Sequence, residues 1–118
     1  MVRPELIAQQ WLERFNAKDL DGLLALYADD CRHTSPKIRA MFPATGGQLV
    51  GKSALRGWWE DAFKRLPGLT YEQTALTADE KSAVLEYVRH APNEPPMFVA
   101  EVFEVRDGRI AASRVYHG

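Results

Sequence analysis

The sequence has little of what several classes of protein require. It contains a single cysteine, Cys31, among 118 residues, so no internal disulfide can form and a reducing compartment is expected. No apolar run approaches the roughly 20 residues of a membrane-spanning helix. The opening MVRPELIAQQWLERF lacks the apolar stretch of a signal peptide. These absences predict a soluble, cytoplasmic protein without a membrane partner.

An excess of positive charge is also missing. Fifteen basic residues face sixteen acidic ones, for a formal net charge of −1, and the arginines alternate with acids instead of forming a stripe. Nucleic-acid binding requires a basic surface that neutralises phosphates. Nucleic acid is therefore not expected as a partner.

Cofactor motifs are scarce. The stretch GGQLVGKS, residues 46–53, fits the spacing of a phosphate-binding loop, but no strand–helix–strand unit surrounds it, so we interpret it as a chance match. The three histidines occur in neither HxH nor HExxH spacing. We expect neither a metal nor another cofactor.

The first half of the chain carries helical patterns. Pro4 opens a stretch in which Ile7, Trp11 and Phe15 recur at helical spacing. Asp19 is predicted to cap a shorter helix that runs through Tyr27, and Ser53 a third helix that ends near residue 66. A short extended segment, 31–35, and a long loop, 36–51, are expected between them.

The second half carries strand patterns at 70–78, 82–91, 97–106 and 109–118. The Asp107–Gly108 pair between the last two predicts a tight antiparallel hairpin. Helices followed by strands indicate one α+β domain, 1–118, with the helices packed on one face of a curved antiparallel sheet.

Three stretches together resemble the SnoaL-like branch of the nuclear-transport-factor-2-like superfamily: AQQWLERFNAKDLDGLLALYADDC, GKSALRGWWEDAF and EVFEVRDGRIAASRVY. The resemblance implies a cystatin-like α+β cone with an apolar pocket and frequent dimerisation through the outer sheet face. Members include ketosteroid isomerases, polyketide cyclases, epoxide hydrolases, dehydratases and non-catalytic binding subunits. The fold therefore does not identify the reaction.

The ketosteroid isomerase branch is similar enough to be aligned with almost no gaps. Its catalytic tyrosine aligns with Trp11, its general-base aspartate with Ser35, and its oxyanion-stabilising aspartate with Glu101. Indole has no useful acid–base behaviour, and a serine hydroxyl does not accept a proton near neutral pH. Isomerase activity by that mechanism is not expected.

Strand alternation and the same resemblance predict the residues of a pocket. If Glu101 faces inward, so do Met97, Val99, Phe103 and Val105. Glu86 is then expected inward with Val84, Val88 and His90, and Ala111, Ser113, Val115 and His117 inward on the last strand. The predicted pocket has apolar walls and a few polar groups: Trp11, Phe15, Trp58, Met97, Phe103 and Val115, with His33, Ser35, Glu86, Glu101 and His117.

We predict Glu101 and His33 as the proton-handling pair, because burial would raise the pKa of the carboxyl and histidine titrates near neutrality. Ser35 or His117 would orient the substrate. Each residue also has a structural interpretation: Glu101 or Glu86 could pair with an arginine, and His117 lies near a chain end.

Three functions remain open. The first is acid–base chemistry on a hydrophobic small molecule, by isomerisation, cyclisation, dehydration or hydrolysis. The second is a non-catalytic ligand-binding or association module. The third is homodimerisation through an outer sheet face that carries Tyr87, Val102 and Tyr116.

Overall fold

The computed structural model describes residues 3–118 and has the predicted α+β architecture. Its elements are α1 (Pro4–Asn16), α2 (Leu20–Leu24), β1 (Tyr27–Thr34), α3 (Pro36–Met41), the 3₁₀ helix η1 (Pro43–Thr45), β2 (Gln48–Val50), α4 (Lys52–Arg65), β3 (Thr70–Ala78), β4 (Ser82–His90), β5 (Met97–Arg106) and β6 (Arg109–His117). None of the helices within 3–118 is long and apolar enough to cross a membrane.

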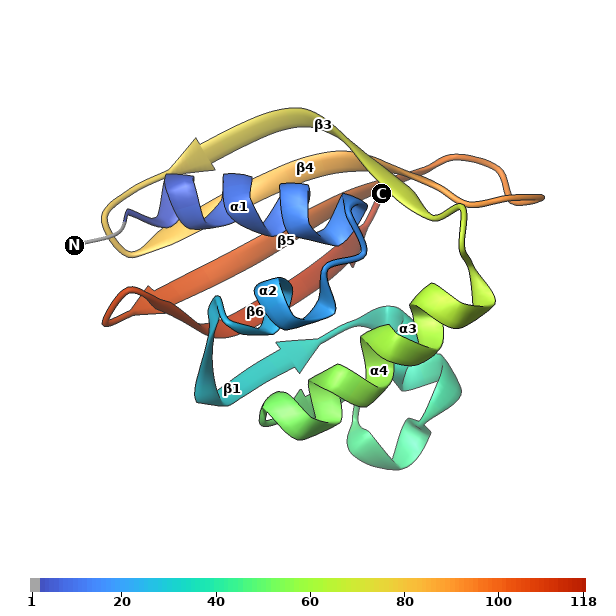
Figure 1. Cartoon of the computed structure of the whole chain (residues 1–118), viewed down its shortest axis with the longest axis horizontal. Coiled ribbons are helices and arrows are strands. Elements are labelled where there is room, and N and C mark those ends of the chain that lie inside the picture. Colours follow the sequence, from blue (N-terminus) through green and yellow to red (C-terminus); the bar gives the residue numbers. More distant parts are fainter. Residues whose placement is uncertain (1–2) are drawn as a thin grey trace.

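The six strands form one sheet in the order β2-β1-β6-β5-β4-β3. Helix α1 packs on β3, β4 and β5, and α4 packs on β1 and β2, so both cover the same face (Figure 1). The sheet is not wholly antiparallel as predicted, because β1 and β6 pair in parallel. Residues 35–108 lie between these two strands and supply the long connection that a parallel pair needs.

The hairpin of β5 and β6 forms as predicted. Asp107 and Gly108, at its tip, both have positive φ, 54° and 76°. This is the conformation that two-residue hairpin turns require and that an Asp-Gly pair accommodates.

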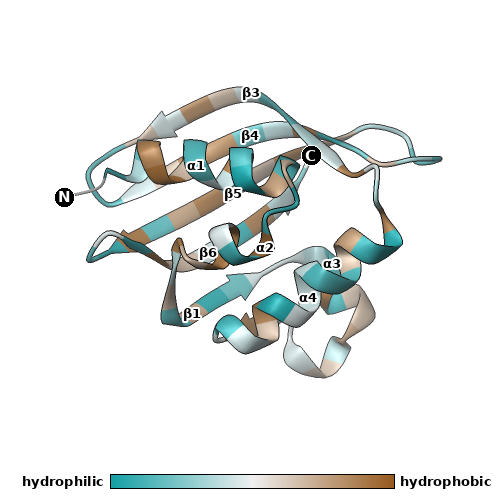
Figure 2. Ribbon diagram, viewed as in Figure 1, coloured by the Kyte–Doolittle hydropathy of each residue, from teal (hydrophilic) through white to brown (hydrophobic). Residues whose placement is uncertain are grey.

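Residues on the inner and outer faces alternate along the strands, and Figure 2 shows hydrophobic and hydrophilic bands alternating along β5. Val99, Glu101 and Phe103 are buried on the inner face, as predicted. On β4 the prediction is wrong by one residue. Leu85 is the partner of Glu101 and points inward, whereas Glu86 is the partner of Ala100 and is exposed on the outer face.

The same register corrects two further expectations. Tyr87 was expected on the outer face but is buried on the inner one, beside Leu85 and Arg89. His90 was expected to point into the pocket but lies on the other side, where its Nε2 is 2.9 Å from Glu72 Oε1. Directly paired residues of an antiparallel sheet share a face, so fixing Glu101 inward fixes the whole of β4.

The second predicted helix is shorter than expected. Asp19 caps it, with Oδ1 accepting from Gly22 N at 3.0 Å, but the helix ends at Leu24. Tyr27 belongs instead to β1, which spans Tyr27–Thr34. Pairing with β6 outweighs local helical spacing here, since it lets the Tyr27 ring bury completely.

Residues 36–51 are not the long loop that was predicted. Ser35 caps α3 by accepting from Lys37 N at 3.2 Å, and η1 and β2 follow. Helix α4 begins at Lys52, after Gly51, so Ser53 lies within its first turn and is not the cap. Because β2 pairs antiparallel with β1, the GGQLVGKS stretch has no strand–helix–strand context.

Candidate functional site

A small cavity of about 50 Å³ lies between the helices and the inner face of the sheet, and we call it the inner chamber. Eight of the eleven helices and strands named above contribute residues to its wall. Its lining residues are Trp11, His33, Ser35, Lys37, Trp58, Trp59, Tyr71, Tyr87, Arg89, Val99, Glu101, Val115 and His117.

A larger cavity of about 240 Å³, the outer chamber, adjoins it. Both are lined by Lys37, Trp58, Trp59, Tyr71 and Arg89, so the two chambers are neighbours across shared side chains. The remaining lining residues of the outer chamber are Phe15, Ala40, Met41, Ala62, Arg65, Leu66, Leu69 and Glu94. Most of this wall is apolar, as in many small-molecule sites.

Glu101 is the most unusual residue of the inner chamber. Its exposed fraction is 2%, and the Tyr87 hydroxyl donates to Oε1 at 2.9 Å, while Oε2 has no hydrogen-bond partner among the described residues. Burial raises the pKa of the carboxyl to about 8, and the Tyr87 hydrogen bond opposes this only partly. At neutral pH the carboxyl is therefore mainly protonated.

His33, on β1, is also buried and lies 5.7 Å from the Trp59 ring between centroids. Burial lowers its pKa to about 4, so the imidazole is neutral over the physiological range. The expectation that it titrates near neutrality therefore does not hold, since desolvation disfavours the imidazolium. Its Nδ1 lies 2.6 Å from Ser113 Oγ on β6.

A buried chain of hydrogen bonds connects His33 to helix α1. Trp11 Nε1 donates to the Tyr27 hydroxyl at 3.0 Å, and that hydroxyl lies 3.5 Å from Ser113 Oγ. Indole can only donate, so the Tyr27 oxygen accepts from Trp11. When the Ser113 hydroxyl donates to Nδ1, the proton of the neutral ring is on Nε2, and that nitrogen is a donor.

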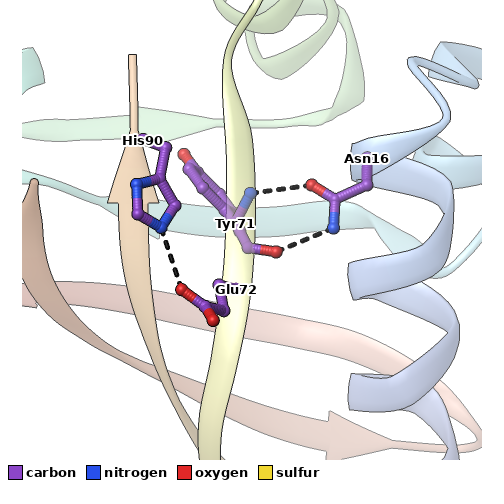
Figure 3. Close-up of polar contacts among 4 residues, drawn as sticks. All are labelled: Asn16, Tyr71, Glu72 and His90. Carbon is purple, nitrogen blue, oxygen red and sulfur yellow. Dashed lines mark hydrogen bonds and ion pairs between the residues drawn. The ribbon is translucent and has the colours of Figure 1, made fainter.

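Tyr71, on β3, is held against the site from outside. The Asn16 side chain, at the end of α1, accepts from Tyr71 N and donates to Tyr71 O, both at 2.8 Å (Figure 3). The Tyr71 ring stacks between Phe15 and Tyr87, with centroid distances of 4.0 and 4.1 Å. This clamp fixes a side chain that lines both chambers.

The other predicted site residues divide into three groups. Trp11, Ser35, Trp58, Val115 and His117 line the inner chamber, and Phe15 lines only the outer one. Phe103 and Met97 line neither. Phe103 fills the core against Trp11, at 5.2 Å between ring centroids, and Met97 packs at the edge of the core. Glu86 is on the outer face of the sheet and does not contribute.

Sequence reasoning missed Lys37, Tyr71, Tyr87 and Arg89 as lining residues. Lys37 was assigned to a loop, because a six-residue helix behind a proline carries little periodicity. Tyr87 and Arg89 follow Ala83 and Leu85 at two-residue spacing and so share their face, which was a usable signal for the inner face of β4. Within residues 3–118, no three His, Cys, Asp or Glu side chains are grouped to hold a metal ion.

Comparison with known proteins was made at the levels of sequence family and of structure. Residues 8–113 match the model of the SnoaL-like domain. A search of the curated proteins finds no match.

Among solved structures, a SnoaL-like protein of unknown function from Burkholderia thailandensis E264 is 27% identical, with a TM-score of 0.84 over 98% of this chain and 94% of that one. A protein provisionally assigned as a ketosteroid isomerase, from Kribbella flavida DSM 17836, is 20% identical, with a TM-score of 0.80 over 98% and 77%.

A protein provisionally assigned as a polyketide cyclase, from Sinorhizobium meliloti, is 22% identical, with a TM-score of 0.79 over 93% of each chain. The two latter likenesses concern the fold. Because the family model covers most of the sequence, the chain belongs to the SnoaL-like family, as its sequence motifs predicted.

Proposed function

We propose that this protein binds a hydrophobic carbonyl compound in the two chambers and that Glu101 donates a proton, or a hydrogen bond, to the carbonyl oxygen. The observation that carries the proposal is the buried Oε2 of Glu101, which has no partner among the described residues and belongs to a residue that lines the inner chamber. Burying a polar atom without a partner costs about 1–3 kcal/mol, and a ligand oxygen would recover that cost.

The chemistry follows from the protonation states. A neutral Glu101 donates from Oε2, and the Tyr87 hydroxyl, bonded to Oε1, stabilises the carboxylate once the proton has left. With its ring proton on Nε2, His33 offers a second donor. Two donors on one carbonyl oxygen stabilise negative charge that develops there, as in water addition or ring closure.

The groups around the ligand are donors, and none is a strong base at neutral pH. Ser35 uses its oxygen to cap α3, and the Trp11 N–H is committed to Tyr27. This favours reactions driven by polarising a carbonyl over those that remove a proton from carbon. It also favours the rival function, a non-catalytic binding module, because two positions that carry chemistry in the isomerase branch here serve the fold.

The test compares Glu101→Gln with Glu86→Gln, a matched carboxylate on the exposed outer face. Hydrophobic ketones, quinones and polyketide-like compounds would be screened by thermal shift and their products sought by mass spectrometry. Loss of product with ligand binding retained in Glu101→Gln, and no change in Glu86→Gln, supports the proposal. Turnover that survives Glu101→Gln overturns it, and bound ligand without any product favours the binding module.

Homodimerisation stays a proposal of its own. Phe98 and Tyr116 are exposed at 69% and 54% on neighbouring strands β5 and β6, on the face that the helices leave uncovered. Apolar exposure of this kind is typical of a contact surface. Sedimentation velocity of the protein and of the double variant Phe98→Ser and Tyr116→Ser tests it, since a monomeric protein at micromolar concentration would refute it.

A further inference from the structure

The outer chamber carries charge that the proposed reaction does not use. Three cationic side chains line it, Lys37 from α3, Arg65 from α4 and Arg89 from β4, and the only acidic one is Glu94. Arg89 is the most buried of these, since 7% of its side chain is exposed. Charged side chains are seldom buried to this extent without a partner, so the pairing of each one matters.

Two of the three cations already have carboxylate partners. Arg89 donates to Glu94 Oε1 at 2.8 Å, and Arg65 donates to Asp61 Oδ2 at 2.7 Å, one turn earlier in α4. Lys37 forms no ion pair within residues 3–118, and its side chain lines both chambers. One positive charge is therefore left over at the wall that the two chambers share.

Neighbouring groups respond to this positive field. Partial burial lowers the pKa of Lys37, and the charges of Arg89 and Arg65 lower it further, whereas Glu94 opposes them. At the end of β6, burial lowers the pKa of His117, and the charges of Lys37 and Arg89 add to that effect. A negatively charged group placed beside Lys37 would relieve this repulsion.

The surroundings restrict the shape of such a ligand. Aromatic side chains that line the outer chamber include Phe15, Trp58, Trp59 and Tyr71. Their faces suit a flat apolar body. The volume of about 240 Å³ is below the roughly 300–1,000 Å³ of sites for drug-sized ligands, so the body is limited to one or two rings.

We propose that the ligand is a small aromatic or similarly flat carboxylate whose anionic group binds beside Lys37 and Arg89. One unpaired cation matches a monoanion better than a phosphate dianion, and the planar guanidinium of Arg89 matches the planar carboxylate. This inference names the ligand class of the proposed function, and it rests on that proposal only in taking the two chambers as the ligand site.

The test uses 2-naphthoate and its neutral isostere 2-naphthamide, with binding measured by isothermal titration calorimetry. All three tryptophans of the chain line the chambers, so their indole N–H signals in ¹H–¹⁵N spectra report binding at this place. We expect the carboxylate to bind about tenfold or more tightly than the amide, as one charge-assisted hydrogen bond supplies.

Lys37→Met should abolish this preference while keeping the apolar stem of the side chain, and Lys37→Arg should restore it. Lys64→Met removes a lysine whose side chain is 76% exposed on α4 and should change nothing. Any of four results would overturn the inference. They are equal affinity for the acid and the amide, an unchanged preference in Lys37→Met, displacement of naphthoate by equimolar inorganic phosphate, and no naphthoate binding at millimolar concentration.

The two proposals fail separately. Glu101→Gln should leave the naphthoate preference intact, since Glu101 does not line the outer chamber. If naphthoate is preferred but Glu101→Gln has no effect on product formation, the proposed role of Glu101 is refuted and the carboxylate site is supported. If acid and amide bind equally but Glu101→Gln abolishes turnover, the carboxylate site is refuted and the role of Glu101 is supported.

Discussion

At the scale of single residues, the site depends on a tyrosine that no sequence signal marks as important. Tyr27 is fully buried, and its hydroxyl accepts a hydrogen bond from Trp11 Nε1 at 3.0 Å and lies 3.5 Å from Ser113 Oγ. Burial raises its pKa well above the usual value, and the charge of Glu101 adds to this, so it stays a neutral hydroxyl. Its role is to connect helix α1 with the histidine on β1.

We expect Tyr27→Phe to lower the free energy of unfolding by about 1–3 kcal/mol, because the buried indole N–H of Trp11 loses its acceptor. Urea unfolding followed by tryptophan fluorescence measures the change. Tyr116→Phe, at an exposed position of β6, is the control and should stay within about 0.5 kcal/mol of the parent protein. Equal losses in both variants would show that the hydrogen bond contributes nothing specific.

At the scale of elements, the chain turns from β2 into α4 at Gly51. This residue has φ 89° and ψ 155°, a region that residues with a side chain rarely occupy. A Cβ there would meet only Asp29 O, at 3.8 Å, so space is available and the obstacle is the backbone conformation. Trp58 and Trp59 lie on the helix that follows, so the turn also sets the wall of both chambers.

Gly51→Ala should therefore destabilise the protein by about 1–3 kcal/mol through backbone strain. Gly57→Ala is the matched substitution within α4, where a Cβ meets nothing within 4 Å and alanine is the better helix former, and should stabilise by about 0.5–1 kcal/mol. Thermal and urea unfolding compare the two. An unchanged unfolding midpoint in Gly51→Ala would contradict the explanation by backbone strain.

At the scale of the whole molecule, two buried groups of the inner chamber oppose each other in the pH dependence of stability. Glu101 has its pKa raised from 4.5 to about 8, so the folded protein keeps a proton that the unfolded chain releases, and stability falls as the pH rises between these values. His33 has its pKa lowered from 6.5 to about 4, so stability falls as the pH drops through that range.

From pH 4.5 to 6.5 the contributions of Glu101 and His33 to the pH dependence of stability offset each other, and from pH 6.5 to 8, of these two groups, only Glu101 contributes. The pKa of His117 is also lowered, so His117 too acts below pH 6.5. We expect the free energy of unfolding to fall by up to about 1.4 kcal/mol per pH unit between pH 6.5 and 8. Urea unfolding at a series of pH values measures this slope.

Glu101→Gln should remove that slope and leave stability flat above pH 6.5, because the amide does not titrate. Below pH 6.5 its stability should decline, since the opposing effect of His33 remains. Glu86→Gln should keep the slope of the parent protein. If Glu101→Gln retains the full slope, another group is responsible and Glu101 is ionised in the folded protein.

Much of the arrangement was predictable from local patterns. The Asp-Gly pair placed the final hairpin, because its turn depends on neighbouring residues alone. The resemblance to the isomerase branch gave the inward face of Glu101, and alternation along 97–106 then placed Val99 and Phe103 beside it. The face of β4 was assigned wrongly, because alternation gives two answers that differ by one residue and only pairing with β5 selects between them. The short α3, and with it Lys37, lies below the length at which periodicity is readable.

The sequence was enough to establish the α+β class and the family, since these follow from periodicity, turn chemistry and the order of motifs. Tertiary structure decided the protonation states, because burial depends on the packing of α1 and α4 against the sheet. Burial raised the pKa of Glu101 and lowered that of His33, and packing left Lys37 without an ion pair within residues 3–118. Residues far apart in the chain create these conditions together, and no local sequence pattern predicts which of them come into contact.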